Sequence, residues 1–230
     1  MVTINLGAVR EVAEIETMMA KARRDFRNLI DRQRRDSGVW EAVEALAWME
    51  TDAFDLEDYP RLGPDKQEQY AQFIQVFHGS SGVIWCPHLH GVIRLTPGLD
   101  VGTVRTAFER QWPGHRRVDV RTFTDEKSMI VNLGDIINYA LKADCTTEYY
   151  NAETGETTYV EWETAWLGEY YTWLHGWSRG SQSLRLSINP KMCDEAAVAC
   201  VDYDEEMEIE PLPFACSFSV FPTDYYTGNL

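Results

Sequence analysis

The stretch WCPHLHGVIRL, residues 85–95, is the most informative part of the chain for the fold. Its side chains are almost all apolar, which is typical of a strand buried on both faces of a sheet. Two histidines, His88 and His90, interrupt the apolar run two residues apart. Because residues i and i+2 of a strand project from the same face, the two imidazoles should lie side by side. The stretch therefore predicts a buried strand that carries two potential metal ligands.

Strand and helix patterns alternate along the rest of the chain. The spacing of apolar residues, and the Pro and Gly residues at segment ends, separate one element from the next. This order predicts an α+β fold in which helices pack on a central antiparallel sheet. The expected helices are 9–36, 64–78, 99–112, 129–143 and 164–177, and the expected strands are 44–54, 83–95, 115–123, a hairpin in 148–162, and one in 178–190.

Charge is distributed unevenly, although the chain as a whole carries a net charge of −16. Residues 20–35 contain seven basic and two acidic side chains, whereas residues 191–230 contain one basic and nine acidic ones. We therefore divide the chain into an N-terminal basic helix (1–36), a central domain (37–190) and an acidic C-terminal extension (191–230). The overall acidity argues against a general nucleic-acid coat, because phosphate contacts need Lys and Arg. Local basic patches keep a polyanionic partner in consideration.

The five cysteines are scattered and include no Cys-x-x-Cys pair, as expected of reduced thiols in a cytoplasmic protein. No signal peptide is visible, and no apolar run approaches the roughly 20 residues that a membrane helix needs. We expect a cytoplasmic protein without a membrane partner.

A divalent metal ion is the expected occupant of the His88–His90 pair, because neutral imidazoles are good metal ligands. A carboxylate would complete a set of two histidines and one acid suited to Mn²⁺ or Mg²⁺. The preceding strand, LAWMETDAF (residues 46–54), places Glu50 and Asp52 on one face. We favour Glu50, which has apolar neighbours, with Asp52 and His78 as alternatives. The competing interpretation is that the two histidines form a purely structural pair.

A second group of reactive side chains lies in LGDIINYALKAD, residues 133–144. Asp135, Tyr139 and Lys142 are spaced i, i+4 and i+7, so they share one face of the expected helix. A phenol with a pKa of about 10 is a poor nucleophile at neutral pH. A nearby metal ion and the Lys142 ammonium would favour the phenolate and hold a phosphate beside it.

These segments together resemble the HUH endonuclease superfamily. PHLHGVI (87–93) looks like its His-hydrophobe-His motif, and INYALKA (137–143) looks like its Tyr-x-x-Lys nucleophile helix. LAWMETDAF is similar to the upstream acidic strand of plasmid rolling-circle replication initiators (Rep proteins), and RNLIDRQRRD (27–36) is similar to the basic helix before it. The resemblance covers roughly residues 20–190 and implies an HUH-type nuclease domain with a ferredoxin-like sandwich fold.

The resemblance also implies roles for individual residues. His88, His90 and Glu50 would hold the metal ion, Tyr139 would be the nucleophile, and Lys142 would assist at the phosphate. The family's reaction cuts single-stranded DNA at a replication origin or hairpin. It leaves a 5′-phosphotyrosyl link and a free 3′-hydroxyl that primes synthesis by a host polymerase.

Several features depart from the family's pattern. A long insertion, residues 55–82, separates the acidic strand from the histidines, and the nucleophile helix has no second tyrosine at Tyr-x-x-x-Tyr spacing. The chain therefore fits the single-tyrosine class, and Asp135 is our candidate for activating water or a second strand at termination. No phosphate-binding P-loop is visible, so a helicase would come from the host.

Other histidine-site classes fit the sequence less well. Position 92 is Val92 where a histidine-triad hydrolase needs a third histidine. GVIRLTP lacks the glutamate of a cupin, and the His-x-His-x-Asp-His pattern of metallo-β-lactamases is missing. The alternatives are a relaxase or transposase of the same superfamily, or a non-catalytic DNA- or partner-binding protein on the same scaffold. The candidate phosphate-binding residues are Arg23, Arg24, Arg27, Arg116, Arg117 and Arg121.

Overall fold

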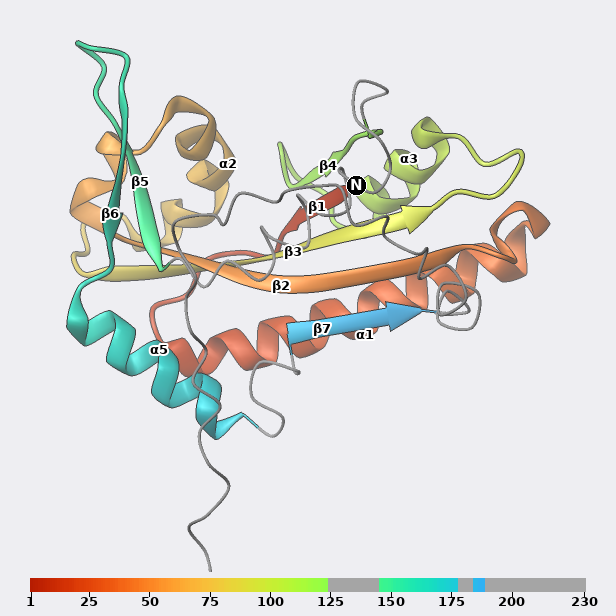
Figure 1. Cartoon of the computed structure of the whole chain (residues 1–230), viewed down its shortest axis with the longest axis horizontal. Helices are drawn as coiled ribbons and strands as arrows, with labels where there is room; N and C mark the ends of the chain where they lie inside the picture. The colour runs from red at the N-terminus through yellow and green to blue at the C-terminus, as the bar shows by residue number, and fades with distance from the viewer. Residues whose placement is uncertain (124–144, 178–183, 189–230) are drawn as a thin grey trace, which may run out of the picture. The chain divides into compact units, whose positions relative to one another are not determined.

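A computed structural model describes residues 1–123, 145–177 and 184–188 of the chain. Its central feature is a five-stranded antiparallel sheet in the order β4-β1-β3-β2-β7, with helices packed on it (Figure 1). The strands are β1 (Val2–Asn5), β2 (Glu44–Asp55), β3 (Val83–Arg94), β4 (Val118–Val120) and β7 (Arg185–Ile188), with a separate hairpin of β5 (Thr146–Tyr150) and β6 (Thr157–Glu161). The helices are α1 (Val12–Asp36), α2 (Pro64–Ile74), α3 (Val101–Gln111) and α5 (Thr164–Gly176), with 3₁₀ turns η1 (Gly38–Trp40), η2 (Leu56–Arg61) and η3 (Gln75–Phe77). The α+β prediction is confirmed.

Strand β3, which carries both histidines, is the middle strand of the sheet. It pairs with β2 along its whole length and with β1 around the histidines, and most of its residues from Ile84 to Gly91 are buried. Gly91 allows β1 and β2 to approach β3 closely. A methyl group there would lie 3.1 Å from Val2 Cγ1 and 3.2 Å from Ala47 Cβ, which is too close without a shift of a neighbour.

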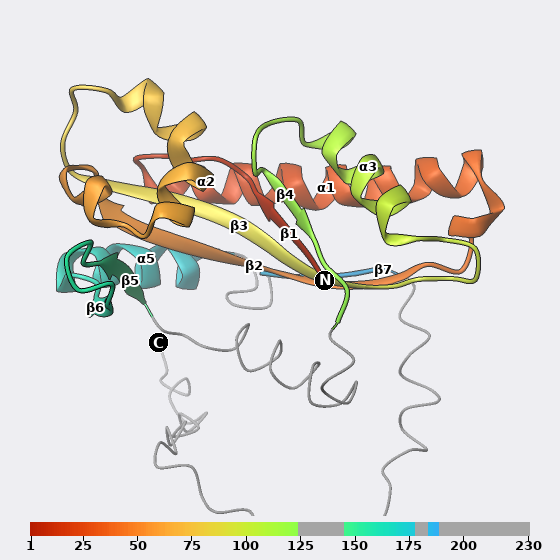
Figure 2. The ribbon, with the colours of Figure 1, turned by 90° about the horizontal axis from the view of Figure 1, so that it is seen from above.

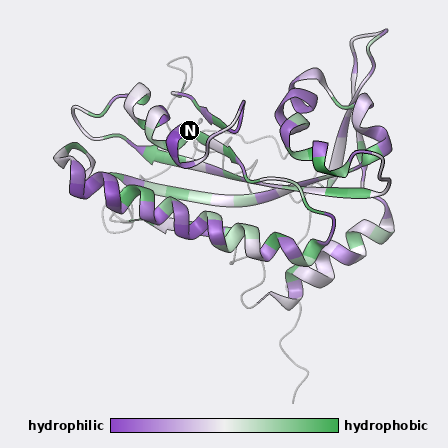
Figure 3. Ribbon diagram, turned by 180° about the vertical axis from the view of Figure 1, so that it is seen from behind, coloured by the Kyte–Doolittle hydropathy of each residue, from purple (hydrophilic) through white to green (hydrophobic). Residues whose placement is uncertain are grey.

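Helix α1 covers one face of the sheet, running alongside β2 and β3 (Figure 2). Its buried residues recur every three or four positions, as expected of a helix with one apolar stripe. They pack against Ala47 and Met49 of β2 and Leu89 of β3. Hydrophilic residues alternate with hydrophobic ones along α1 in Figure 3. The buried residues of α1 are Val12, Ile15, Met19, Ala22, Phe26, Leu29 and Ile30.

The opposite face of the sheet is covered at the end where β2 stops and β3 begins. Helix α2 and the hairpin β5–β6 lie together there (Figure 1). A second apolar cluster of Phe54, Leu62, Tyr70, Ile84 and Cys86 fills the space between them and the sheet. Next to this cluster, the same face carries polar side chains of β1, β2 and β3.

Most elements predicted from the sequence are present with small shifts of their ends. Strand β1 was not predicted, although it lies beside β3 in the sheet. The predicted strand 115–123 is only the three residues of β4. Residues 1–36 form a strand as well as a helix, and both β1 and α1 contribute to the main core. The predicted helix 129–143 and the acidic extension lie outside the described residues.

None of the described helices combines the length and the apolarity needed to cross a membrane.

Candidate metal centre

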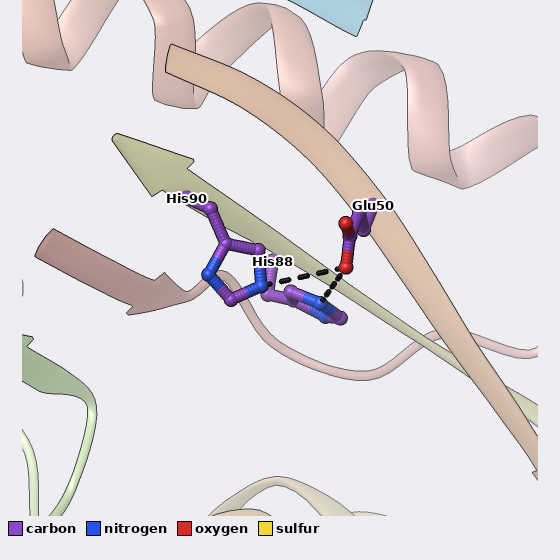
Figure 4. A group of neighbouring side chains, drawn as sticks. All are labelled: Glu50, His88 and His90. Carbon is purple, nitrogen blue, oxygen red and sulfur yellow. Dashed lines mark hydrogen bonds and ion pairs between the residues drawn. The ribbon is translucent and has the colours of Figure 1, made fainter. Parts of the chain in front are cut away.

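Glu50, His88 and His90 converge from the two central strands (Figure 4). The β2–β3 register pairs Glu50 with His88 and Trp48 with His90, so all three ligand candidates project from the same face. Glu50 Oε2 lies 3.1 Å from His88 Nε2 and 3.4 Å from His90 Nε2. The side chains of His88, His90 and Glu50 are only 6%, 12% and 21% exposed. Glu50 is therefore the acid that the structure brings to the histidines.

The second nitrogen of each imidazole is engaged by the protein. His88 Nδ1 donates to the carbonyl of Cys86 at 3.2 Å, and a hydrogen bond of 2.9 Å joins His90 Nδ1 to Thr3 Oγ1. Metal-binding histidines commonly have such a partner on the nitrogen that does not bind the metal. Both rings are consequently oriented with Nε2 toward Glu50.

The charges in the cluster suit a cation. Burial opposes ionisation of Glu50, but the hydrogen bonds and charges of both histidines lower its pKa to about 2. Burial also lowers the pKa of His90, and the bond to Glu50 offsets this only in part. The pKa of His88 is raised, because Glu50 and Asp52 outweigh the effect of burial. At neutral pH Glu50 is an anion and His90 a neutral ring, which are the forms that bind a metal, whereas a metal would have to displace a proton from His88.

The spacing of these atoms also fits a single ion. Ligand atoms about 2.1 Å from one ion, at right angles to one another, lie about 3 Å apart. The separations from Glu50 Oε2 to the two imidazole nitrogens are close to this value. Glu50 Oε1 is buried and has no hydrogen-bond partner among the described residues, so this oxygen remains available to a ligand. Glu50, His88 and His90 could hold a metal ion.

A hollow of about 810 Å³ lies beside the cluster on the same face of the sheet. Trp48 forms part of its wall, with its indole stacked near the ring of His90 at a centroid distance of 6.2 Å. The hollow carries both charges, with Lys66 and Arg116 as well as Asp52 and Asp65 on its wall. It is large enough for a small ligand or for a segment of a larger one.

Neither of the two alternative third ligands belongs to the cluster. Asp52 projects from the same face of β2 but accepts a hydrogen bond from Tyr70 and forms an ion pair with Lys66 at 3.3 Å. His78 is exposed at the end of η3 and is not part of the cluster.

The six candidate DNA-binding arginines fall into two groups. Arg23, Arg24 and Arg27 belong to α1, which packs on the face of the sheet opposite the histidines. Arg24 and Arg27 are exposed, whereas Arg23 lies over the ring of Trp177 at 6.0 Å. These three residues do not lie beside the metal cluster.

The second group lies around β4, closer to the hollow. Arg116 pairs with Asp65 at 2.8 Å and with Glu68 at 2.9 Å, and Arg121 pairs with Asp119 at 2.5 Å. The guanidinium group of Arg117 donates to the carbonyls of Asn5 and Leu6, which anchors the end of β1. Arg116 and Arg121 line the hollow, and Arg117 has a structural role.

Tyr139, Lys142 and Asp135 lie outside the described residues, so their predicted roles stay predictions. Two residues near the histidines were missed in the sequence, Thr3 and Asn5 of β1, which pair with His90 and His88. The alternating run Val2-Thr3-Ile4 is a recognisable strand signal, but it is short and lies at the start of the chain.

The fold and the cluster define an α+β protein with a candidate divalent-metal centre on the central strands of its sheet. Comparison with known protein families, with curated proteins and with solved structures gives no match.

Proposed function

We propose that the protein is a metal-dependent endonuclease of the HUH type, which nicks and rejoins single-stranded DNA to start rolling-circle replication. Support comes from the candidate metal cluster, whose two histidines lie on the middle strand of the sheet with Glu50 opposite them. The adjoining hollow gives a substrate access to this face. The order of motifs in the sequence supplies the nucleophile, Tyr139.

Mn²⁺ is the metal that we favour over Mg²⁺. Two of the three candidate ligands are imidazole nitrogens, whereas Mg²⁺ prefers oxygen ligands and water. When bound, the cation would withdraw charge from the scissile phosphate.

The chain's own residues would carry the covalent steps. The Tyr139 oxygen attacks the phosphorus and forms a phosphotyrosyl bond while the bond from phosphorus to the 3′-oxygen breaks. The phenolic proton passes to the 3′-oxygen through solvent. Because one phosphate ester replaces another, no external energy source is consumed. Lys142 would neutralise the phosphate, and Asp135 would activate the nucleophile that resolves the link.

A covalent-adduct assay tests this proposal. The full chain is incubated with Mn²⁺ and a randomised single-stranded oligonucleotide library labelled at the 3′ end, and the products are run on a denaturing gel. Because the tyrosine would be joined to the 5′-phosphate of the fragment downstream of the cut, the 3′ label should migrate with the protein and return to small size after protease digestion. A 5′-labelled library should instead give shortened free DNA.

Matched variants identify the nucleophile. Tyr139→Phe should abolish the adduct, and Tyr159→Phe, which changes an exposed tyrosine of β6, should leave it intact. A library that gives no adduct with the unaltered protein in Mn²⁺, but is retained in a gel-shift assay, would contradict the nuclease and favour the non-catalytic DNA-binding alternative.

A further inference from the structure

The Nδ1 atoms of the two imidazoles in the metal cluster form hydrogen bonds with different kinds of group. His88 Nδ1 meets a backbone carbonyl, that of Cys86, whereas His90 Nδ1 meets the hydroxyl of Thr3. A carbonyl can only accept a hydrogen bond, so it keeps a proton on His88 Nδ1, and Nε2 becomes a ligand when a metal displaces the proton that Nε2 shares with Glu50. At His90 the position of the ring proton depends instead on one side chain of another strand, that of Thr3 in β1.

We propose that Thr3 is a positioning residue for the metal centre, whose hydroxyl accepts the Nδ1 proton of His90 and holds the Nε2 lone pair toward the ion shared with His88 and Glu50. The inference rests on the metal-binding part of the proposed function and not on DNA cleavage. Its geometric basis is the 2.9 Å contact between Thr3 Oγ1 and His90 Nδ1, on the ring edge away from Glu50.

The strand pairing makes this contact rigid. Thr3 and His90 are direct partners in the antiparallel β1–β3 ladder, so their side chains leave the same face next to each other. Threonine is branched at Cβ, and its χ1 angle is therefore restricted in a strand. Thr3 is partly buried, between Val2 and Ile4, which are fully buried in the core on the other face of the sheet. The core thereby fixes the hydroxyl that orients His90.

This arrangement gives β1 a function in addition to joining β4 to β3 in the sheet. Asn5, the β1 partner of His88, is buried, accepts a hydrogen bond from Gln69 and donates one to the Arg116 carbonyl. It does not contact the His88 ring in the way that Thr3 contacts His90. Thr3 is therefore the β1 residue whose removal should act on the metal.

Metal titration of three variants of the full chain tests the proposal. Thr3→Val keeps the shape of the side chain and removes the hydroxyl, so it should weaken Mn²⁺ binding about 10-fold or more, in the range for outer-shell partners of metal ligands. Thr3→Ser restores the hydroxyl and should bind close to the unaltered protein. Thr147→Val is the matched control, because it removes a buried hydroxyl that donates to the Ala53 carbonyl at 2.6 Å, away from the histidines. It should lower the melting temperature without changing Mn²⁺ affinity.

A spectroscopic measurement separates positioning from general destabilisation. With Co²⁺ in place of Mn²⁺, the visible absorption bands of Thr3→Val should change in position or intensity, while those of Thr3→Ser and Thr147→Val should match the unaltered protein. Equal Mn²⁺ affinities and equal Co²⁺ spectra for Thr3→Val and the unaltered protein would overturn the inference and leave the metal centre intact. Absence of Mn²⁺ binding in the unaltered protein would overturn both.

A further measurement needs no substitution at Thr3 and covers the case in which Thr3→Val does not fold. In the unaltered protein loaded with diamagnetic Zn²⁺, long-range ¹H–¹⁵N NMR should show His90 coordinated through Nε2, with a slowly exchanging proton on Nδ1. Coordination of His90 through Nδ1 would contradict the assigned role of Thr3.

Discussion

Glu50 and Asp52 leave the same face of β2 two residues apart, yet their surroundings differ in kind. Asp52 has a cation of its own, because Lys66 lies 3.3 Å away and also approaches Glu148 at 3.7 Å. Glu50 faces two imidazoles and has no lysine or arginine partner among the described residues. Both carboxyl groups have a pKa of about 2, but burial is overcome at Asp52 by Lys66 first and at Glu50 by hydrogen bonds from histidines.

The contrast between Asp52 and Glu50 shows that one strand, β2, carries a structural carboxylate and a candidate metal ligand. The Asp52 group, with Lys66 and Tyr70, is complete within the protein and fixes α2 to the sheet. The Glu50 group has a buried oxygen without a hydrogen-bond partner among the described residues, beside two oriented nitrogens. A charge that the fold leaves without a full counter-ion is the one available for an external cation.

The largest expected effect is on metal affinity. Glu50→Gln removes the anionic ligand and should weaken Mn²⁺ binding at least about 100-fold, beyond the 10- to 100-fold loss typical of outer-shell changes. Asp52→Asn removes a charge that Lys66 already balances and should change the affinity less than about 3-fold. Isothermal titration calorimetry of both variants measures this. An equal loss of Mn²⁺ affinity in the two variants would contradict the assignment of Glu50, and not Asp52, as the metal ligand.

Stability of the metal-free protein should fall in both variants. Asp52→Asn leaves the Lys66 ammonium facing an amide and should lower the free energy of unfolding by about 2 to 3 kcal/mol, less than for a fully buried pair because both side chains are about a quarter exposed. Glu50→Gln should lower it by a similar amount, because the pKa of about 2 means that the two histidines stabilise the Glu50 carboxylate in the folded state. Urea unfolding in the presence of a chelator measures both changes. Unchanged stability in either variant would contradict the contacts assigned to that carboxylate.

The contribution of the Asp52–Lys66 ion pair to stability should depend on pH when a chelator keeps the protein free of metal. The pKa of Asp52 falls from 3.8 to about 2 on folding, so its contribution to stability is present above pH 4 and is lost as the pH falls toward 2. At the higher pH this contribution is about 2 kcal/mol. The gap in unfolding free energy between the unaltered protein and Asp52→Asn should therefore narrow by about 1 to 2 kcal/mol over this interval. A gap that stays constant with pH would mean that the ion pair does not form.

The smallest effect is expected at His78, which the sequence offers as another third ligand. Its side chain is exposed and lies outside the cluster, so His78→Ala should change stability by less than about 0.5 kcal/mol. Mn²⁺ affinity should also be unchanged. Weaker Mn²⁺ binding by this variant would place His78 at the metal.

The strand that carries the histidines could be predicted because its pattern is local. The apolar run around His88 and His90 and the alternation around Glu50 specify two strands and the faces of their side chains. The apolar neighbours of Glu50 favour it over Asp52, and the β2–β3 register places it opposite His88.

The partners that complete these residues could not be predicted, because they come from distant parts of the chain. The pairing of Thr3 with His90 joins residues 87 positions apart, and nothing in the four residues of β1 indicates which strand it joins. Lys66 reaches Asp52 only because α2 folds back over the end of β2 and β3. Tertiary contacts, more than local patterns, decide which carboxylate is balanced and which is available.

The location of a bound ion tests the central claim most directly. Crystals of the full chain grown with Mn²⁺ should show an anomalous scattering peak about 2.2 Å from Nε2 of His88, Nε2 of His90 and a carboxylate oxygen of Glu50. A peak at Asp52, or no peak near the histidines at saturating Mn²⁺, would contradict the assignment of this cluster as a metal centre.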